Sequence, residues 1–346
     1  MNQLGFPILS LITYLPLLGA FIIATLSGDD AKIACRARAI ALGFSLLVLV
    51  LGIYVWTQFN TGIAGYQFVE AMPWLSGINV EYRMGVDGIS LFLILLTLVL
   101  TPIAILSSNG IKTRARSFFA AMLLLETMTI GMFAATDFVL FYIFFEAVLL
   151  PMYLIIGVWG GERRIYAAVK FFVFTLAGSL FMLLAVVWIW RHLGTTNIAV
   201  MTHAAIPAHA QMWLFLAFLA AFGVKAAVWP LHTWLPDAYG EAPVPGTIML
   251  AAVLSKMGAY GFLRFALPML PNAAYAAEPL MFTLGVVAVI YISYVALAQT
   301  DMKRMIAYSS VAHMGVIIIG LFTFTVEGIE GALFQICLLY TSDAAD

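Results

Sequence analysis

Residues 211–243 read QMWLFLAFLAAFGVKAAVWPLHTWLPDAYGEAP. Its first part is apolar over a length that can cross a bilayer, yet it contains Lys225. Three prolines follow, Pro230, Pro236 and Pro243, and proline inside a helix removes a backbone donor and clashes with the preceding turn. The stretch therefore predicts a membrane helix that breaks just after a buried lysine, with Pro230 and Pro236 at the break. The alternative is an ordinary loop with a tight turn.

Non-helical backbone within the hydrocarbon region of a membrane is found only in particular surroundings. It is tolerated where protein surrounds it or where it lines a water-filled cavity, which is how ion pathways of transporters are built. A break beside Lys225 thus favours a transport function over a purely structural one.

The composition of the 346 residues indicates a membrane protein. Hydrophobic residues make up 64% of the chain, charged residues only 10%, and the mean hydropathy is +1.05, which excludes a soluble domain. Ten apolar segments can span a bilayer, and an eleventh begins near Ile329. We therefore predict a polytopic all-α bundle. Ten apolar windows are long enough to span a bilayer: Phe6–Ser27, Arg38–Gln58, Gly88–Ser108, Ser117–Ala135, Phe138–Trp159, Ala167–Trp190, Gln211–Trp229, Val244–Leu267, Ala277–Gln299 and Ile306–Phe324.

The last ten residues, CLLYTSDAAD (337–346), match a sequence that does not come from a protein gene. One reading frame of a widely used transposase sequencing adapter translates to this string, so we expect residues 337–346 to be a library artefact rather than protein-coding sequence. The reading frame is then expected to be cut within its eleventh helix.

The loop charges predict the orientation of the chain. Loops after odd-numbered spans contain eleven Lys and Arg residues, and loops after even-numbered spans contain three. Because cytoplasmic loops carry the excess of Lys and Arg, the N-terminus is predicted to face outward. The same parity predicts that the segment from Pro230 to Pro243 does not cross the membrane.

Four ionisable residues lie near the middle of different spans: Glu146, Lys225, Lys256 and His313. At a rise of about 1.5 Å per residue, each lies roughly 14 to 21 Å from a span end, so they form a row within the membrane plane. Such residues are rare and are functional suspects. Glu146 beside Lys225 is expected to keep both side chains ionised until the pair separates. The alternative is that these side chains, and Glu126 in the fourth span, only fix helix packing.

The sequence contains few features of a redox or metal enzyme. If residues 337–346 are excluded, Cys35 is the one native cysteine, which is too few for an iron–sulfur cluster or an internal disulfide. There is no Gly-rich phosphate loop, no metal-ligand cluster and no catalytic triad. We therefore expect no metal and no cofactor in this chain, and we assign any redox cofactor to partner subunits.

Four motifs carry a resemblance to a known family. They are DFVLFYIFFEAVLLPMYLIIGVWGG (137–161), VKAAVWPLHTWLPDAYGEAP (224–243), LSKMGAYGFLRF (254–265) and QTDMKRMIAYSSVAHMG (299–315). These motifs resemble the antiporter-like subunits of respiratory complex I, and GVDGISLFLILLTLVLTPIAILSS (85–108) resembles most specifically the subunit M family, which includes mitochondrial ND4.

The resemblance implies a bundle of about fourteen helices with two inverted repeats of five, each containing one broken helix. On this basis residues 1–116 would form the N-terminal helices, 117–267 the first repeat and 268–336 the incomplete second repeat.

The resemblance also implies a proton relay through Glu146, Lys225, Lys256 and His313. Supporting candidates are Glu126, His232, Asp237 and Glu241. Ala227 and Tyr239 depart from the family pattern, where proline and histidine are frequent, so the geometry of the break could differ.

The implied function is that of a proton-translocating subunit of NADH:quinone oxidoreductase in the bacterial inner membrane. NADH, FMN, iron–sulfur clusters and quinone would bind partner subunits, other antiporter-like subunits would be neighbours, and nucleic acid would not be a partner. Two alternatives are a subunit of a multi-subunit sodium/proton antiporter, and a membrane scaffold or quinone-binding subunit that does not pump.

Overall fold

The computed structural model describes the backbone of residues 5–27 and 30–344, and within these ranges the side chains of residues 30, 31 and 339–344 are not described. The chain forms two compact units that are described separately. The first contains residues 1–159, 195–198 and 243–249, and the second contains residues 160–194, 199–242 and 250–346.

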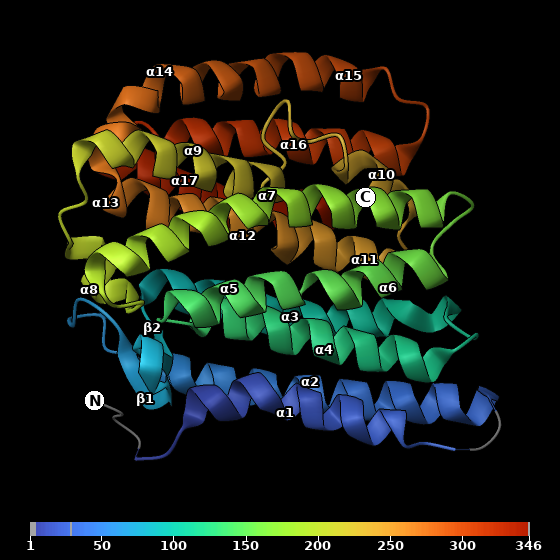
Figure 1. Ribbon diagram of the computed structural model, residues 1–346. Helices are drawn as coiled ribbons and strands as arrows, with labels where there is room; N and C mark the ends of the chain where they lie inside the picture. The colour runs from blue at the N-terminus through green and yellow to red at the C-terminus, as the bar shows by residue number, and fades with distance from the viewer. Residues whose placement is uncertain (1–4, 28–29, 345–346) are drawn as a thin grey trace. The chain divides into compact units, whose positions relative to one another are not determined.

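The first unit is a helical bundle with one β-hairpin, in which α1 lies against α4, and α2 lies against α3 (Figure 1). Its described elements are α1 (Ile8–Ala24), α2 (Asp30–Gln58), β1 (Gln67–Leu75), a 3-10 turn (Ser76–Ile78), β2 (Val80–Val86), α3 (Gly88–Ser107), a second 3-10 turn (Ser108–Gly110), α4 (Ala115–Ala134), α5 (Phe138–Ala147), α6 (Leu149–Trp159) and α11 (Val244–Met249).

The second unit is all-helical, and α7 packs along α9 while α14 and α15 pack along α16 (Figure 1). Its described elements are α7 (Arg164–Leu193), α8 (Ile198–His203, whose first residue belongs to the first unit), α9 (Ala208–Lys225), α10 (Leu235–Glu241), a π-helix (Leu250–Leu254), α12 (Ser255–Gly261), a π-helix (Phe262–Ala266), α13 (Leu267–Met269), α14 (Pro271–Val287), a π-helix (Ala288–Ile292), α15 (Ser293–Leu297), α16 (Met302–Leu321) and α17 (Val326–Ala344).

The helices confirm the predicted polytopic membrane fold. Among the described residues, nine helical segments are long and apolar enough to cross a membrane, and α1 is a shorter apolar helix of 17 residues. Each of the ten predicted windows corresponds to one of these segments. The eleventh apolar segment lies in α17, which starts three residues earlier than expected and continues to Ala344. The origin of residues 337–346 stays a prediction.

Aspartates begin three of the spanning helices. Asp87 caps α3 in a capping box with Ser90, Asp137 caps α5, and the Asp301 carboxylate accepts a hydrogen bond from the Arg304 N–H at the start of α16. A side-chain oxygen at this position satisfies backbone donors that have no partner within the helix. These caps explain why the predicted starts of the third and fifth spans match the structure.

The β-hairpin is an element that the sequence analysis did not predict. β1 and β2 pair antiparallel, with Glu70 opposite Met84. The Glu70 carboxylate accepts hydrogen bonds from the backbone N–H groups of Leu9 (2.7 Å) and Ser10 (3.0 Å) in the first turn of α1. The hairpin therefore supplies the cap that α1 lacks in its own sequence.

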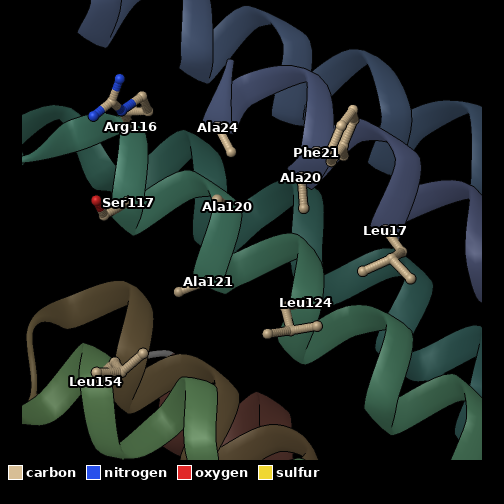
Figure 2. A pocket seen from close by; sticks show the side chains of 10 residues that line it. All are labelled: Leu17, Ala20, Phe21, Ala24, Arg116, Ser117, Ala120, Ala121, Leu124 and Leu154. Atoms are coloured by element: carbon tan, nitrogen blue, oxygen red, sulfur yellow. The ribbon is translucent and has the colours of Figure 1, made fainter. Parts of the chain in front are cut away.

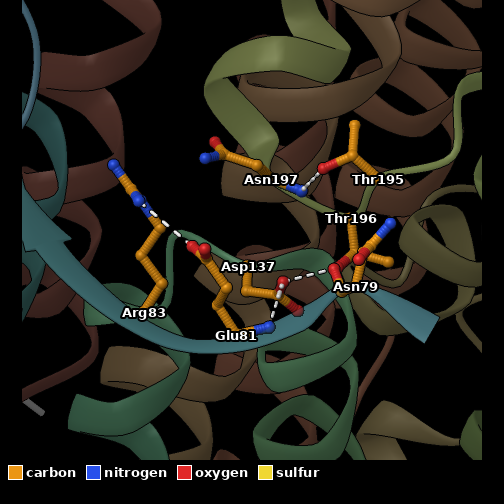
Figure 3. Close-up of polar contacts among 7 residues, drawn as sticks. All are labelled: Asn79, Glu81, Arg83, Asp137, Thr195, Thr196 and Asn197. Atoms are coloured by element: carbon orange, nitrogen blue, oxygen red, sulfur yellow. Dashed lines mark hydrogen bonds and ion pairs between the residues drawn. The ribbon is translucent and has the colours of Figure 1, made fainter. Parts of the chain in front are cut away.

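Loops after the second, fourth and sixth spans meet at one end of the first unit (Figure 3). The Asp137 carboxylate accepts hydrogen bonds from the Thr196 hydroxyl (2.5 Å) and from the backbone N–H groups of Glu81 (3.3 Å) and Val139 (2.9 Å). Burial raises the pKa of Asp137, and these hydrogen bonds oppose that shift. One carboxylate thus joins three loops, all of which parity places on the same side.

Loops after odd-numbered spans meet at the other ends of the same helices. The Arg116 guanidinium donates to the carbonyl of Leu26 (2.9 Å), and the Trp159 indole donates to the carbonyl of Thr113 (2.8 Å). The alternation of the loops between two ends agrees with the span order that we counted from the sequence.

We expect Asp137→Ala to destabilise the first unit because it removes the cap of α5 and the link to Thr196. The cost should be about 1 to 2 kcal/mol, seen as a lower thermal unfolding midpoint of the reconstituted full-length subunit. Asp137→Asn is the matched control, since its amide oxygen can still accept at the cap, and it should retain most of the stability. Equal losses in the two variants would contradict this role.

Candidate functional site

The predicted break follows Lys225 directly. The α9 helix ends at Lys225, and residues 226–234 form turns before α10 begins at Leu235. The predicted span to Trp229 was therefore too long by four residues. The correction places the Lys225 side chain, which is 2% exposed, at the C-terminal end of a half-helix. The negative end of a helix dipole favours a cation at this position.

The backbone groups freed by the break have partners within the protein. The Trp234 indole donates a hydrogen bond of 2.8 Å to the carbonyl of Val224, and the Val228 N–H donates to the carbonyl of Gly223. Trp234 is 1% exposed, so this carbonyl is satisfied away from solvent. An unsatisfied backbone group in hydrocarbon costs several kcal/mol, so Trp234 is a supporting residue of the break that the sequence analysis did not identify.

The break has its own backbone geometry at Ala227. This residue adopts a left-handed conformation with φ of 53°, and its N–H donates to the carbonyl of Val224. Proline fixes φ near −65° and has no N–H. The alanine that departs from the family pattern therefore adopts a conformation that the more frequent proline could not adopt.

Lys256 lies in a helix with irregular turns. It is fully buried on α12, between the π-helical stretches Leu250–Leu254 and Phe262–Ala266. The Lys256 ammonium donates to the carbonyl of Ala251, within the first π-helical stretch. Such π-bulges occur often at functional sites, and here one places a carbonyl oxygen at the buried ammonium.

A glycine brings the Lys256 helix against the break. A Cβ added at Gly258 would lie 2.5 Å from the backbone nitrogen of Ala226 and 2.5 Å from the carbonyl oxygen of Phe222. Only glycine permits this approach, because any side chain would displace the backbone of α9. The helix segment that carries Lys256 thus touches the chain one residue after Lys225.

His313 is half-buried on α16. Its Nδ1 lies 3.1 Å from the amide nitrogen of Gln335 on α17. A ring nitrogen of His313 thus has a polar partner near the middle of a predicted membrane span. Gln335 was not singled out from the sequence, because a lone glutamine in an apolar segment has no distinctive spacing.

Neighbouring segments bind the acidic residues of the α10 helix, Asp237 through basic side chains and Glu241 through a backbone N–H. The Asp237 carboxylate lies 2.7 Å from the Lys170 ammonium and 3.8 Å from the Arg304 guanidinium. The Glu241 carboxylate accepts a hydrogen bond of 2.9 Å from the Arg163 N–H. These contacts attach α10 to α7 and α16 and so hold the half-helix that follows the break.

His232 lies within the break and is 8% exposed. Its ring centroid is 6.4 Å from that of Tyr308 on α16. Among the described residues, the His232 Nδ1 has no hydrogen-bond partner. The structure therefore places the His232 ring of the broken segment beside the Tyr308 ring of α16.

Glu146 belongs to the first unit and lies in the last turn of α5. The α5 helix ends at Ala147, and Pro151 follows four residues later in α6. Because a proline ring clashes with the carbonyl four residues before it, Pro151 accounts for the interruption after Ala147. The interruption therefore lies within one turn of Glu146.

Glu126 lies on α4, which precedes α5 in the same unit. It is fully buried, and neither carboxyl oxygen has a hydrogen-bond partner among the described residues. Glu126 precedes the end of α4 by eight residues, and Glu146 follows the start of α5 by eight residues. Both lie about 12 Å along their helices from the connecting turn.

The structure brings Lys225 and Lys256 onto touching segments of the second unit and places His313 and His232 on or beside α16. Within the described residues, no group of three His, Cys, Asp or Glu side chains could hold a metal ion. The chemistry that this arrangement offers is reversible protonation of buried lysine and histidine side chains.

Comparison with known proteins identifies the class. A family described as NADH:quinone oxidoreductase/Mrp antiporter, transmembrane, matches residues 135–344. A second family, described as NADH-ubiquinone oxidoreductase chain 4, amino terminus, matches residues 39–132. Together they cover most of the chain, so the broken-helix bundle is an antiporter-like membrane subunit.

The individual relatives are more specific. NADH-quinone oxidoreductase subunit M of Rhodobacter capsulatus is 46% identical over 95% of this chain and 66% of the relative. Subunit M of Rickettsia prowazekii is 45% identical over 96% of this chain and 68% of the relative. A chain of respiratory complex I from Thermus thermophilus with bound NADH superposes with a TM-score of 0.86 at 30% identity, over 97% of this chain and 68% of that one.

This chain belongs to the subunit M family of NADH-quinone oxidoreductases, and it spans about two thirds of the length of these relatives.

We expect Trp234→Phe to destabilise the break because it removes one of the two donors to the Val224 carbonyl, the other being the Ala227 N–H, while keeping the aromatic volume. The cost should be about 0.5 to 1.5 kcal/mol, the net contribution of one hydrogen bond, measured as a lower unfolding midpoint of the reconstituted full-length subunit. Trp213→Phe is the matched control, since Trp213 is 75% exposed, and should change little. A Trp234→Phe subunit as stable as the control would show that the indole hydrogen bond is dispensable.

Proposed function

We propose that this chain is a proton-translocating subunit of NADH:quinone oxidoreductase, in which protons pass through Lys225, Lys256 and His313 with Glu146 controlling the first step. The observation that carries the proposal is the buried ammonium of Lys225 at the end of a half-helix, in a chain of the subunit M family.

The surroundings of Lys225 suit a group that gains and loses a proton. Desolvation acts against the ammonium form of a buried lysine, whereas the negative end of a helix dipole acts in its favour. When these opposing effects are close in size, a small change in nearby charge decides whether the proton stays. We assign this change in charge to the carboxylate of Glu146.

The next step is assigned to Lys256, whose helix segment touches the chain beside Lys225 through Gly258. His313 follows, with Gln335 holding its Nδ1. Glu126 and His232 are assigned supporting positions on this route. Asp237, which binds Lys170 of α7 and Arg304 of α16, and Glu241, which accepts from the backbone N–H of Arg163 just before α7, hold α10 in place.

The driving reaction belongs to other subunits. We assign NADH, FMN, iron–sulfur clusters and quinone to partners, and neighbouring antiporter-like subunits to contacts within the membrane. We further propose the bacterial inner membrane as the location, with the N-terminus outside, on the basis of the Lys and Arg excess in odd-numbered loops. Residues 117–267 are assigned to a first five-helix repeat and 268–336 to the start of a second.

A sodium/proton antiporter subunit is the nearest alternative, because the family matched by residues 135–344 includes Mrp antiporters. The match of residues 39–132 to chain 4 of the oxidoreductase favours the redox-driven enzyme instead. A scaffold or quinone-binding role would leave the buried lysines without a catalytic use.

We expect Lys225→Ala to abolish redox-driven proton pumping through this subunit, since the proton carrier beside the break is lost. The measurement is the number of protons moved per electron pair in liposomes that contain the assembled complex with a full-length subunit. NADH:quinone electron transfer and assembly are measured on the same samples, so that a failure to assemble is distinguished from a loss of pumping.

Lys112→Ala is the matched control, because Lys112 is an exposed lysine outside the described spans, and it should leave the stoichiometry unchanged. Full pumping stoichiometry in the Lys225→Ala complex would refute the proposed route. Sodium-dependent pumping would favour the antiporter alternative.

A further inference from the structure

An apolar groove runs along the surface of the first unit between α1, α4 and α6 (Figure 2). Its volume is about 670 Å³. It is hollow because small side chains lie between bulky ones. The small lining residues are Ala20 and Ala24 on α1 and Ser117, Ala120 and Ala121 on α4, and the bulky ones are Leu17, Phe21, Leu124 and Leu154.

One end of the groove is polar. Arg116 and Ser117 line this end, while Leu17 and Leu124 line the opposite part (Figure 2). The Arg116 guanidinium has five N–H donors, and one is used on the carbonyl of Leu26. Arg116 is exposed, so the remaining donors can reach a ligand. The groove therefore combines a cationic end with an apolar body.

The polar end lies at the first turn of α4, where the fourth apolar span begins. Trp159, at the end of the fifth span, donates to the carbonyl of Thr113 beside this end, and Trp is enriched where membrane meets water. Lys112 and Arg114 lie in the same loop. From Arg116 to Leu124 the groove extends about 12 Å along α4, close to the roughly 15 Å of one hydrocarbon leaflet.

We propose that this groove binds one anionic phospholipid, with its phosphate on Arg116 and an acyl chain along the α1–α4 wall. The charge of Arg116 is complementary to a phosphate, and the apolar wall is complementary to a hydrocarbon chain. Phe21, which is 68% exposed, supplies an apolar rim on the side of the lipid.

The test uses the assembled complex with a full-length subunit, reconstituted into nanodiscs of phosphatidylcholine. Photoactivatable phosphatidylglycerol and photoactivatable phosphatidylcholine with identical acyl chains serve as probes, and the cross-linked peptides are identified by mass spectrometry. We expect phosphatidylglycerol to label peptides of α1 and α4 about tenfold more than phosphatidylcholine, as one charge-assisted contact provides.

Three variants separate the two halves of the site. Arg116→Gln should reduce the preference for phosphatidylglycerol about tenfold, whereas Lys112→Gln, in the same loop but outside the groove, should leave it unchanged. Ala120→Phe fills the groove and should remove labelling by both probes. If Arg116→Gln does not assemble, Arg116→Lys keeps the charge and should keep the preference.

Several results would overturn the proposal. They are equal labelling by the two probes in the unmodified complex, a preference that persists when Ala120→Phe fills the groove, and a cross-link of another subunit's helix to the groove residues. The last result would identify the groove as a protein interface.

Discussion

The structure depends on one constraint: every backbone group freed at the end of α9 must find a partner inside the protein. Hydrocarbon offers none, so a helix can stop within a membrane only if side chains and turns replace its missing hydrogen bonds. The Trp234 indole and the turn N–H groups supply them. Because the break is stable, Lys225 can sit at a helix end, where its charge meets a dipole instead of apolar side chains.

Other contacts within the second unit fix the position of this break. Gly258 lets the Lys256 segment touch the backbone beside Lys225, and ion pairs of Asp237 attach α10 to its neighbours. In the first unit, Asp137 joins three loops at the start of the helix that carries Glu146. Polar contacts at loop ends thus hold the helices that carry the four proposed relay residues.

Much of this architecture could be predicted, because long apolar windows, Asp caps and prolines are local signals. The windows beginning at Gly88 and Phe138 match the helices at their first residue. The hairpin of β1 and β2, the π-helical turns around Lys256, and the partners Trp234, Gln335 and Lys170 could not be predicted. Their roles depend on which distant segments meet, and that information is absent from local patterns.

The most direct test of the central claim, that Lys225 and Lys256 serve one proton path, is a double-mutant cycle on pumping. Protons per electron pair are measured for Lys225→Met, Lys256→Met and the double variant in assembled, reconstituted complexes. A shared path predicts that the double variant pumps no less than either single variant, because residues that act as one unit are non-additive. Losses that add independently would contradict the account.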